Sequence, residues 1–154
     1  MPQSHISHSP RSNLAQWLCY LENIHATEID LGLSRISQVA QHLAIDLSFA
    51  KVITVAGTNG KGTTCAFLEN AILAENKSVA VYSSPHIEQF NERLRINKVD
   101  IAHKPLIEAF NLIEAARGEI SLTYYEYTTL AAFVILTLIR PDFIILEVGL
   151  GGRL

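Results

Sequence analysis

A β-branched run, a glycine-rich loop and an amphipathic segment follow one another near the middle of the chain. The run is Val52–Ala56, the loop is Gly57–Thr63, and apolar residues then recur at helical spacing between Cys65 and Ile72. Unpaired N–H groups at a helix start attract anions, and glycines let the backbone curl around phosphate oxygens. This order predicts a buried strand that leads into a phosphate-binding loop at the start of a helix.

The loop supplies the candidate nucleotide-binding residues, which are Gly57, Thr58, Asn59, Gly60, Lys61, Gly62 and Thr63. Lys61 is a mobile charge for the outer phosphates of ATP and a candidate catalytic residue, and the hydroxyl of Thr63 or Thr64 can reach Mg2+. The general pattern G-x-x-x-x-G-K-[ST] has glycine where this chain has Val55, and Ser or Thr where it has Gly62. A plain helix-entry turn with a surface lysine is the alternative, and the strand before the loop argues against it.

Apolar runs alternate with helical patterns along the chain. Strands are predicted at residues 52–56, 78–82, 94–96 and 143–146, and helices at 14–24, 33–43, 61–72, 105–118 and 126–139. Arg93 and Arg95 are expected on the exposed face of the small strand at 94–96. Apolar strands that alternate with helices indicate the α/β class, with a P-loop-type parallel sheet covered by helices on both faces.

Composition narrows the class of partner. Hydrophobic residues make up 49% and charged residues 18%, which is typical of a globular protein. The net charge is -3 and no basic stripe alternates with aromatic residues, so nucleic acid is not an expected partner. The longest apolar stretch, Leu130–Ile139, is far shorter than the ~20 residues that span a bilayer, so no membrane segment is expected. Cys19 and Cys65 are expected to be buried, reduced thiols, as in a cytoplasmic protein.

The ends of the chain differ from its middle. Residues 1–12 are polar and are expected to form a flexible tail. Residues 147–154 form a glycine-rich turn after a predicted central strand, at the edge where ligands of parallel sheets gather. We therefore expect residues 13–154 to be an incomplete N-terminal domain of a longer protein.

Two oxygen-bearing residues follow predicted strands and are candidate Mg2+ ligands. Glu147 ends the apolar strand at 143–146; it could merely cap a turn, but a phosphate loop one or two strands away favours a metal role and a catalytic one. Ser84 lies in the sequence Ser83-Ser84-Pro85, where turn chemistry is the stronger interpretation from the residues alone.

Several stretches resemble one family of ligases. The loop Val55–Thr63 resembles that of the Mur ligase superfamily, and the fuller match is to folylpolyglutamate synthases and bifunctional dihydrofolate synthase/folylpolyglutamate synthases. Further matches, in the same order and spacing, are Tyr20–Asn23, Ile29–Leu33, Tyr82–His86, Asn91–Arg93, Leu122–Glu126 and Leu146–Leu154. The resemblance covers residues 13–154, and the stretches Asp30–Leu33 and Leu122–Glu126 look most like the bifunctional bacterial type.

The resemblance implies an activity and a set of sites. It implies an ATP-dependent ligase that adds L-glutamate to dihydropteroate, and then to folates, through an acyl phosphate. In the family, residues matching Ser84 and Glu147 hold Mg2+, and the loop binds the ATP phosphates. The pterin-site residues that the resemblance implies are Asp30, Leu31, Gly32, Leu33, Thr123, Tyr124, Tyr125, Glu126 and Leu154. A monomeric full-length enzyme is expected.

Departures from the family limit what this chain is expected to do alone. Tyr125 stands where the family usually has Phe, so a ring survives but gains a hydroxyl that needs a partner if it is buried. The sequence does not contain the family's later Asp-Ala-Thr-Asn segment, its metal-binding histidine, its modified lysine or its C-terminal glutamate-ligase domain, so the chain alone is expected to be inactive. A Mur-type peptidoglycan ligase and a non-catalytic nucleotide-binding module are the alternatives.

Overall fold

The computed structural model describes residues 11, 13–23, 33–57, 59–83 and 93–147. The helices are α1 (Leu14–Asn23), α2 (Ser34–His42), α3 (Lys61–Ala74), α4 (His103–Arg117) and α5 (Tyr124–Ile139). The strands are β1 (Lys51–Val55), β2 (Val79–Ser83), β3 (Leu94–Ile96), β4 (Val99–Asp100) and β5 (Phe143–Glu147). The expected tail at residues 1–12 lies outside the described residues, except for Arg11.

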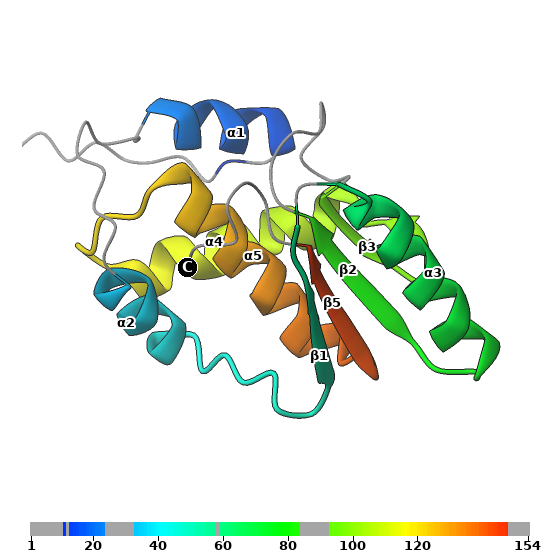
Figure 1. The fold of residues 1–154 in the computed structure, drawn as a ribbon. Helices are drawn as coiled ribbons and strands as arrows, with labels where there is room; N and C mark the ends of the chain where they lie inside the picture. The colour runs from blue at the N-terminus through cyan, green and yellow to red at the C-terminus, as the bar shows by residue number, and fades with distance from the viewer. Residues whose placement is uncertain (1–10, 12, 24–32, 58, 84–92, 148–154) are drawn as a thin grey trace, which may run out of the picture.

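These strands form one sheet in the order β1-β5-β2-β3-β4 (Figure 1). The pairs β1–β5 and β5–β2 are parallel, whereas β2–β3 and β3–β4 are antiparallel. The α/β class and the parallel core of the sheet are therefore confirmed. The sheet differs from the predicted parallel one in its last two strands, β3 and β4, which extend it with antiparallel pairs. The turn between them is formed by Asn97 and Lys98, both at positive φ. Turn residues at positive φ suit a two-residue hairpin connection.

Helices cover both faces of the sheet, as predicted (Figure 1). The helix α3 packs on one face, where Cys65 and Ile72 meet Val81 of β2 and Ile145 of β5. The other face is the larger core, in which α4 and α5 pack on Ala80, Tyr82 and Ile144 while α1 and α2 cover the two helices. Alternate residues of one strand thus enter different cores, because successive side chains of a strand point to opposite faces.

The burial of β1 differs from the prediction. The apolar run 52–56 indicated a buried strand, but Val52 and Thr54 are exposed and only Val55 is buried within β1. The reason is the place of β1 at one edge of the described sheet, where a single strand pairs with it. The run 143–146, by contrast, lies in β5 between two parallel neighbours, and Ile144 and Ile145 are fully buried as expected.

The start of α5 was also predicted two residues too late. Thr123 caps the helix, because its Oγ accepts a hydrogen bond from the Glu126 amide (3.1 Å) while the Glu126 carboxylate accepts one from the Thr123 amide (3.0 Å). This reciprocal capping box explains why the helix begins at Tyr124. The predicted end of α4 at Gly118 is confirmed, since Gly118 has a φ of 54°.

Two further predictions concern membrane segments and the two cysteines. Within the described residues, no helix is long and apolar enough to cross a membrane. Both cysteines are free thiols, but only Cys65 is buried, and the prediction of a buried Cys19 was wrong because its position on α1 faces away from the core.

A polar cluster joins α1, α4 and α5 beside the aromatic core of Trp17 and Phe110. Glu114 of α4 accepts hydrogen bonds from the hydroxyls of Tyr20 and Tyr127 and is paired with Arg117 at 2.7 Å. Burial opposes ionisation of Glu114, but the donors prevail and hold its pKa below the usual value. Stability from this carboxylate is therefore present above the unfolded pKa and is lost as pH falls through the lower folded pKa.

We predict that Glu114→Gln lowers the free energy of unfolding by about 1.5–3 kcal/mol at pH 7, because a charged acceptor of three donors is lost. The difference from the unsubstituted chain should be smaller at a pH of about 3, because this stability is lost as pH falls from the ordinary glutamate pKa of about 4.3 through the lower pKa of folded Glu114. Urea unfolding at both pH values measures it. Glu108→Gln, at an exposed position of the same helix, is the control and should change little at either pH.

Candidate functional site

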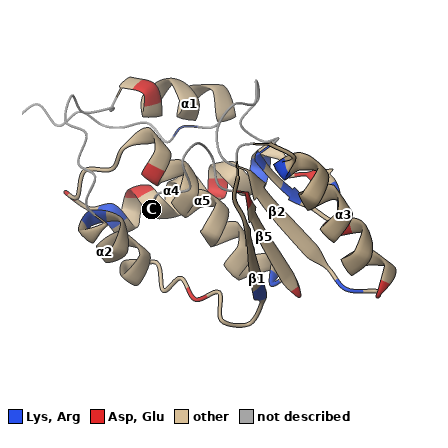
Figure 2. Cartoon of the chain, in the orientation of Figure 1, with Lys and Arg blue, Asp and Glu red and all other residues tan. Residues whose placement is uncertain are grey.

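The parallel pairing brings three strand ends to one edge of the sheet. Val55 of β1 lies opposite Glu147 of β5, and Glu147 lies opposite Ser83 of β2. The glycine loop leaves β1 at the same edge, because Gly57 follows two residues after Val55. Ligands of open parallel sheets bind outside this carboxyl edge. Acidic and basic residues lie together at the end of the sheet where α3 begins (Figure 2).

The glycine loop has the backbone form of an anion site. Gly57 has a φ of 144° and Gly60, the N-cap of α3, has a φ of 76°, which side-chain-bearing residues rarely adopt. The first helical bond runs from the Thr64 amide to the Gly60 carbonyl (3.0 Å), so the amides of residues 61–63 precede the helical ladder. These amides, with the helix dipole, favour a phosphate. Thr58 lies outside the described residues.

Lys61 and the two threonines after it take different places at the start of α3. Lys61 is half-buried and acts electrostatically on Cys65, one turn further along. The hydroxyl of Thr64 donates to the Gly60 carbonyl at 3.0 Å, within the helix itself. Thr63 is exposed. Thr64 is exposed as well, and a hydroxyl that donates a hydrogen bond keeps lone pairs that a cation can use, so Mg2+ binding by Thr63 or Thr64 stays a prediction.

Glu147 is half-buried at the end of β5, next to the strand that carries the loop. Its Oε2 accepts a hydrogen bond of 3.0 Å from the hydroxyl of Ser83, which is 6% exposed. The predicted second ligand, Ser84, lies outside the described residues. A strand-end carboxylate beside a phosphate loop supplies the oxygen ligand that Mg2+ prefers.

A partly buried ion pair holds α3 against the sheet below the loop. Arg95 of β3 donates to both carboxylate oxygens of Glu69 of α3, at 2.9 and 2.5 Å, and Glu69 is only 2% exposed. The hydrogen bonds to Glu69 are the main cause that raises the pKa of Arg95. The expectation that Arg93 and Arg95 lie on an exposed face was therefore wrong: Arg95 faces α3 and is bound to Glu69, and Arg93 is half-buried.

The predicted pterin residues at the start of α5, Thr123–Glu126, are found in two different settings. Glu126 is 8% exposed, caps its own helix and pairs with Arg35 of α2 at 3.2 Å. Arg35 also donates to the carbonyl and hydroxyl oxygens of Ser121, both at 3.0 Å. Thr123 and Glu126 thus hold the helix start, and sequence reasoning missed Arg35 because nothing in its own helix marks it.

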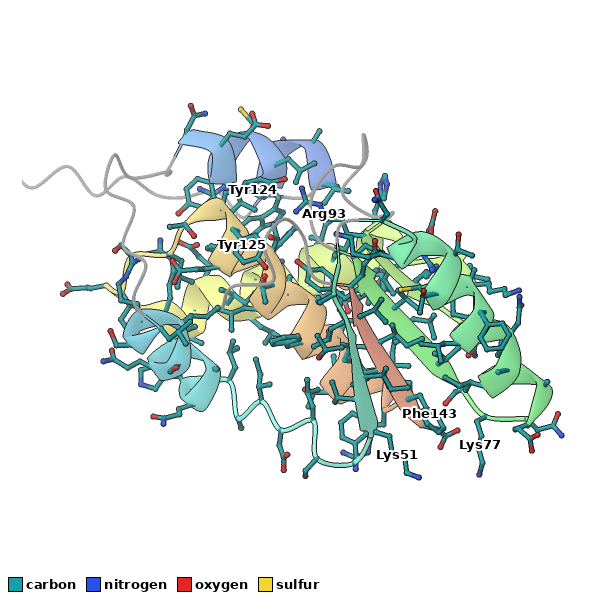
Figure 3. The ribbon with its side chains drawn as sticks, in the orientation of Figure 1. Lys51, Lys77, Arg93, Tyr124, Tyr125 and Phe143 are labelled. Atoms are coloured by element: carbon teal, nitrogen blue, oxygen red, sulfur yellow. The ribbon has the colours of Figure 1, made fainter. Side chains whose placement is uncertain are left out.

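Tyr124 and Tyr125 are the first two residues of α5, and Tyr124 lies near Arg93 (Figure 3). The Arg93 guanidinium is 5.9 Å from the centre of the Tyr124 ring. Burial raises the pKa of Tyr124, although the charge of Arg93 partly opposes this. Tyr125 is 45% exposed, so its additional hydroxyl reaches solvent and needs no buried partner.

A cleft of about 350 Å³ joins the predicted metal acid to the predicted pterin residues. Leu33, Tyr125 and Glu147 all line it, from the start of α2, the start of α5 and the end of β5. Tyr82 and Phe133, which were not among the predicted site residues, form more of its apolar wall. Three residues predicted from separate motifs therefore meet in one cleft. Asp30, Leu31, Gly32 and Leu154 lie outside the described residues.

Relatives of known name match nearly the whole chain. The Escherichia coli (strain K12) dihydrofolate synthase/folylpolyglutamate synthase is 51% identical over 143 residues, which are 93% of this chain and 34% of the relative. The Haemophilus influenzae enzyme of the same name is 49% identical over 93% of this chain and 32% of its own length. No known family profile matches the chain.

A solved structure agrees with this result. It is the Yersinia pestis bifunctional folylpolyglutamate synthase/dihydrofolate synthase complexed with AMPPNP and a Mn ion, with a TM-score of 0.85 and 50% identity, covering 100% of this chain and 36% of that one. The chain is homologous to the N-terminal region of the dihydrofolate synthase/folylpolyglutamate synthase family. It spans about a third of the length of the curated relatives it matches. These relatives favour the folate-ligase interpretation over a peptidoglycan ligase or a non-catalytic module.

We predict that Glu126→Ala lowers the free energy of unfolding by about 1–3 kcal/mol, because it removes one half of the capping box and leaves Arg35 without its carboxylate. Glu126→Gln should cost less, since an amide oxygen still accepts from the Thr123 amide. Urea unfolding of both variants measures this. Glu119→Ala, at an exposed position just before the segment, is the control. A Glu126→Ala chain as stable as the unsubstituted one would contradict this role.

Proposed function

We propose that this chain forms the nucleotide-binding part of an ATP-dependent ligase that joins L-glutamate to dihydropteroate, and then to folates. The observation that carries the proposal is the register that sets Val55, at the root of the glycine loop, opposite Glu147 on the neighbouring strand. This register brings a phosphate site and a carboxylate together, as a phosphoryl-transfer site requires. The family relationship supplies the reaction, since the homologues carry both synthase names.

The residues of the chain fit a nucleotide and a divalent cation. The amides at the start of α3 and the charge of Lys61 suit the outer phosphates of ATP. Glu147, with Ser84 as the further predicted ligand, would hold Mg2+. When bound, Mg2+ offsets the charge that develops on the transferred phosphoryl group. The Yersinia pestis homologue bound to AMPPNP and a Mn ion supports both assignments.

The cleft beside Glu147 fits the acceptor substrate. It is lined mainly by apolar side chains, with Tyr125 at its border, so it suits a flat aromatic ring such as a pterin. The Escherichia coli homologue has been solved with DHPP and ADP, and another bifunctional folylpolyglutamate synthase/dihydrofolate synthase with Mn, AMPPNP and L-glutamate. We place the pterin near Leu33 and Tyr125. The further predicted contacts are Asp30–Gly32, Thr123, Tyr124, Glu126 and Leu154.

In the proposed reaction the acceptor carboxylate attacks the γ-phosphate of ATP, ADP leaves, and an acyl phosphate forms. The amine of L-glutamate then attacks the acyl carbon, the bond to phosphate breaks, and an amide results. The contribution of the chain is positioning and charge. Lys61 and the loop amides orient the phosphates, and the walls of the cleft exclude water from the acceptor.

The proposal also covers the location, the partners and the oligomeric state of the protein. We place the protein in the cytoplasm, where ATP is available, and assign it small-molecule partners and not nucleic acid, in keeping with its net charge of -3. Residues 13–154 are proposed as part of the ATP-binding domain, with glutamate recognised elsewhere in the whole enzyme. A monomeric state of that enzyme is part of the same proposal.

We predict that Lys61→Ala weakens binding of Mg2+-ADP by about 10–100-fold, because a charge-assisted hydrogen bond to phosphate is lost. Lys77→Ala is the matched control, since Lys77 is exposed at the opposite end of the sheet (Figure 3). Isothermal titration calorimetry on the chain measures both. Equal affinities for the two variants would contradict a phosphate role for Lys61.

We predict that Tyr125→Ala weakens dihydropteroate binding by about tenfold, because the stacking ring is removed. Tyr125→Phe should bind as the unsubstituted chain does, since the hydroxyl of Tyr125 reaches solvent. Leu138→Ala, at another exposed apolar position of α5, is the control. Fluorescence titration measures the affinities. Binding of a nucleotide-linked sugar peptide in place of dihydropteroate would favour a Mur-type ligase.

A further inference from the structure

Ser83 and Glu147 are the last residues of two adjacent parallel strands. We propose that Ser83 is a positioning residue, whose hydroxyl holds one carboxylate oxygen of Glu147 so that the other oxygen faces the divalent cation. This inference rests on the proposed role of Glu147 as a cation ligand. Ser83 was not among the residues predicted from the sequence, where its neighbour Ser84 carried the metal assignment.

The ladder places the two side chains on the same face of the sheet. Ser83 and Glu147 are register partners of β2 and β5. The residues two positions earlier, Val81 and Ile145, are partners too, and both enter the core under α3. Because residues i and i+2 of a strand share a face, Ser83 and Glu147 also point toward the side of α3, where the glycine loop begins the helix.

The hydrogen bond restricts the carboxylate to one arrangement. A serine hydroxyl has a single proton, and that of Ser83 is donated to Oε2 of Glu147 at 3.0 Å. Ser83 is 6% exposed, so water has little access to compete for this bond. Glutamate has several rotatable bonds, and a fixed donor to one oxygen removes most of their freedom. Groups that orient a metal ligand through its second atom increase metal affinity.

The neighbouring arginine does not take over this role. Arg95 acts electrostatically on Glu147, but its guanidinium donates two hydrogen bonds to Glu69, at 2.9 and 2.5 Å. The negative charge of Glu69 therefore balances Arg95 directly. Glu147 also acts on Cys65 of α3, where burial first and then the charge of Glu147 raise the pKa of the thiol.

The chain contains the same pair of groups at the other end of the same strands. The hydroxyl of Ser78 donates to Oδ2 of Asp142 at 3.0 Å, just before β2 and β5 begin. This pair joins the same two strands, but at the amino edge, far from the loop. It is a matched control, because its loss should affect the pairing of the strands without affecting a cation site.

The test compares Ser83→Thr with Ser83→Val, which have nearly the same shape and differ by the hydroxyl. Mn2+ is the probe, and its free concentration is followed by electron paramagnetic resonance as the full chain is titrated in the presence of ADP. We expect Ser83→Val to weaken Mn2+ binding by about 10–100-fold, as for other groups that orient metal ligands. Ser83→Thr should bind close to the unsubstituted chain, and Ser78→Ala should leave Mn2+ affinity unchanged.

Equal Mn2+ affinities for Ser83→Val and Ser83→Thr would overturn the inference, and so would an equal loss in Ser78→Ala. Glu147→Gln separates this failure from that of the proposed function. If Glu147→Gln loses Mn2+ binding and Ser83→Val keeps it, only the positioning role is wrong. If Glu147→Gln binds Mn2+ normally, or the unsubstituted chain binds none, the proposed function is wrong as well. If circular dichroism shows that Ser83→Val does not fold, Ser83→Ala removes the hydroxyl without added volume and takes its place.

Discussion

The parallel pairing of β1, β5 and β2 is the interaction on which the candidate site depends. Each pair is in register to its last residue, so that Val55, Glu147 and Ser83 end side by side. Hydrogen bonds along the ladder set this alignment, and a slip by one residue would turn Glu147 to the opposite face of the sheet. The loop that follows β1 and the carboxylate that ends β5 are neighbours for this reason.

Helix placement depends on a second set of interactions, which are polar and partly buried. Arg95 and Glu69 join α3 to β3, and Arg35 and Glu126 join α2 to the start of α5. Breaking such a pair leaves a buried charge without a partner, which is costly, so each pair disfavours other placements of its helix. The first pair holds the helix that begins at the phosphate loop, and the second holds the helix that borders the cleft. Both sides of the site are thereby set relative to the sheet.

Much of the fold could be predicted from local patterns, and the misses have identifiable physical causes. The class, the parallel core and the order of the elements followed from apolar runs alternating with helical segments. The strand at 52–56 was taken as buried because its residues are apolar, yet its place at the sheet edge leaves Val52 exposed. The beginning of α5 was misplaced because Thr123 and Glu126 form a capping box. The pattern of this box is present in the sequence, but these residues were interpreted only as part of the pterin site.

The sequence by itself determined the candidate phosphate loop, because glycines at positive φ and a lysine at a helix start act through local backbone geometry. It also placed Glu147 at the end of an apolar strand. Only the tertiary structure decided that Ser83 holds Glu147, that Arg95 holds Glu69, and that Tyr125 borders the cleft. The physical reason is that the first two contacts join residues 64 and 26 positions apart, and the cleft is lined from three different elements. Strand order and helix packing bring them together, and neither can be predicted from the local preferences of single segments.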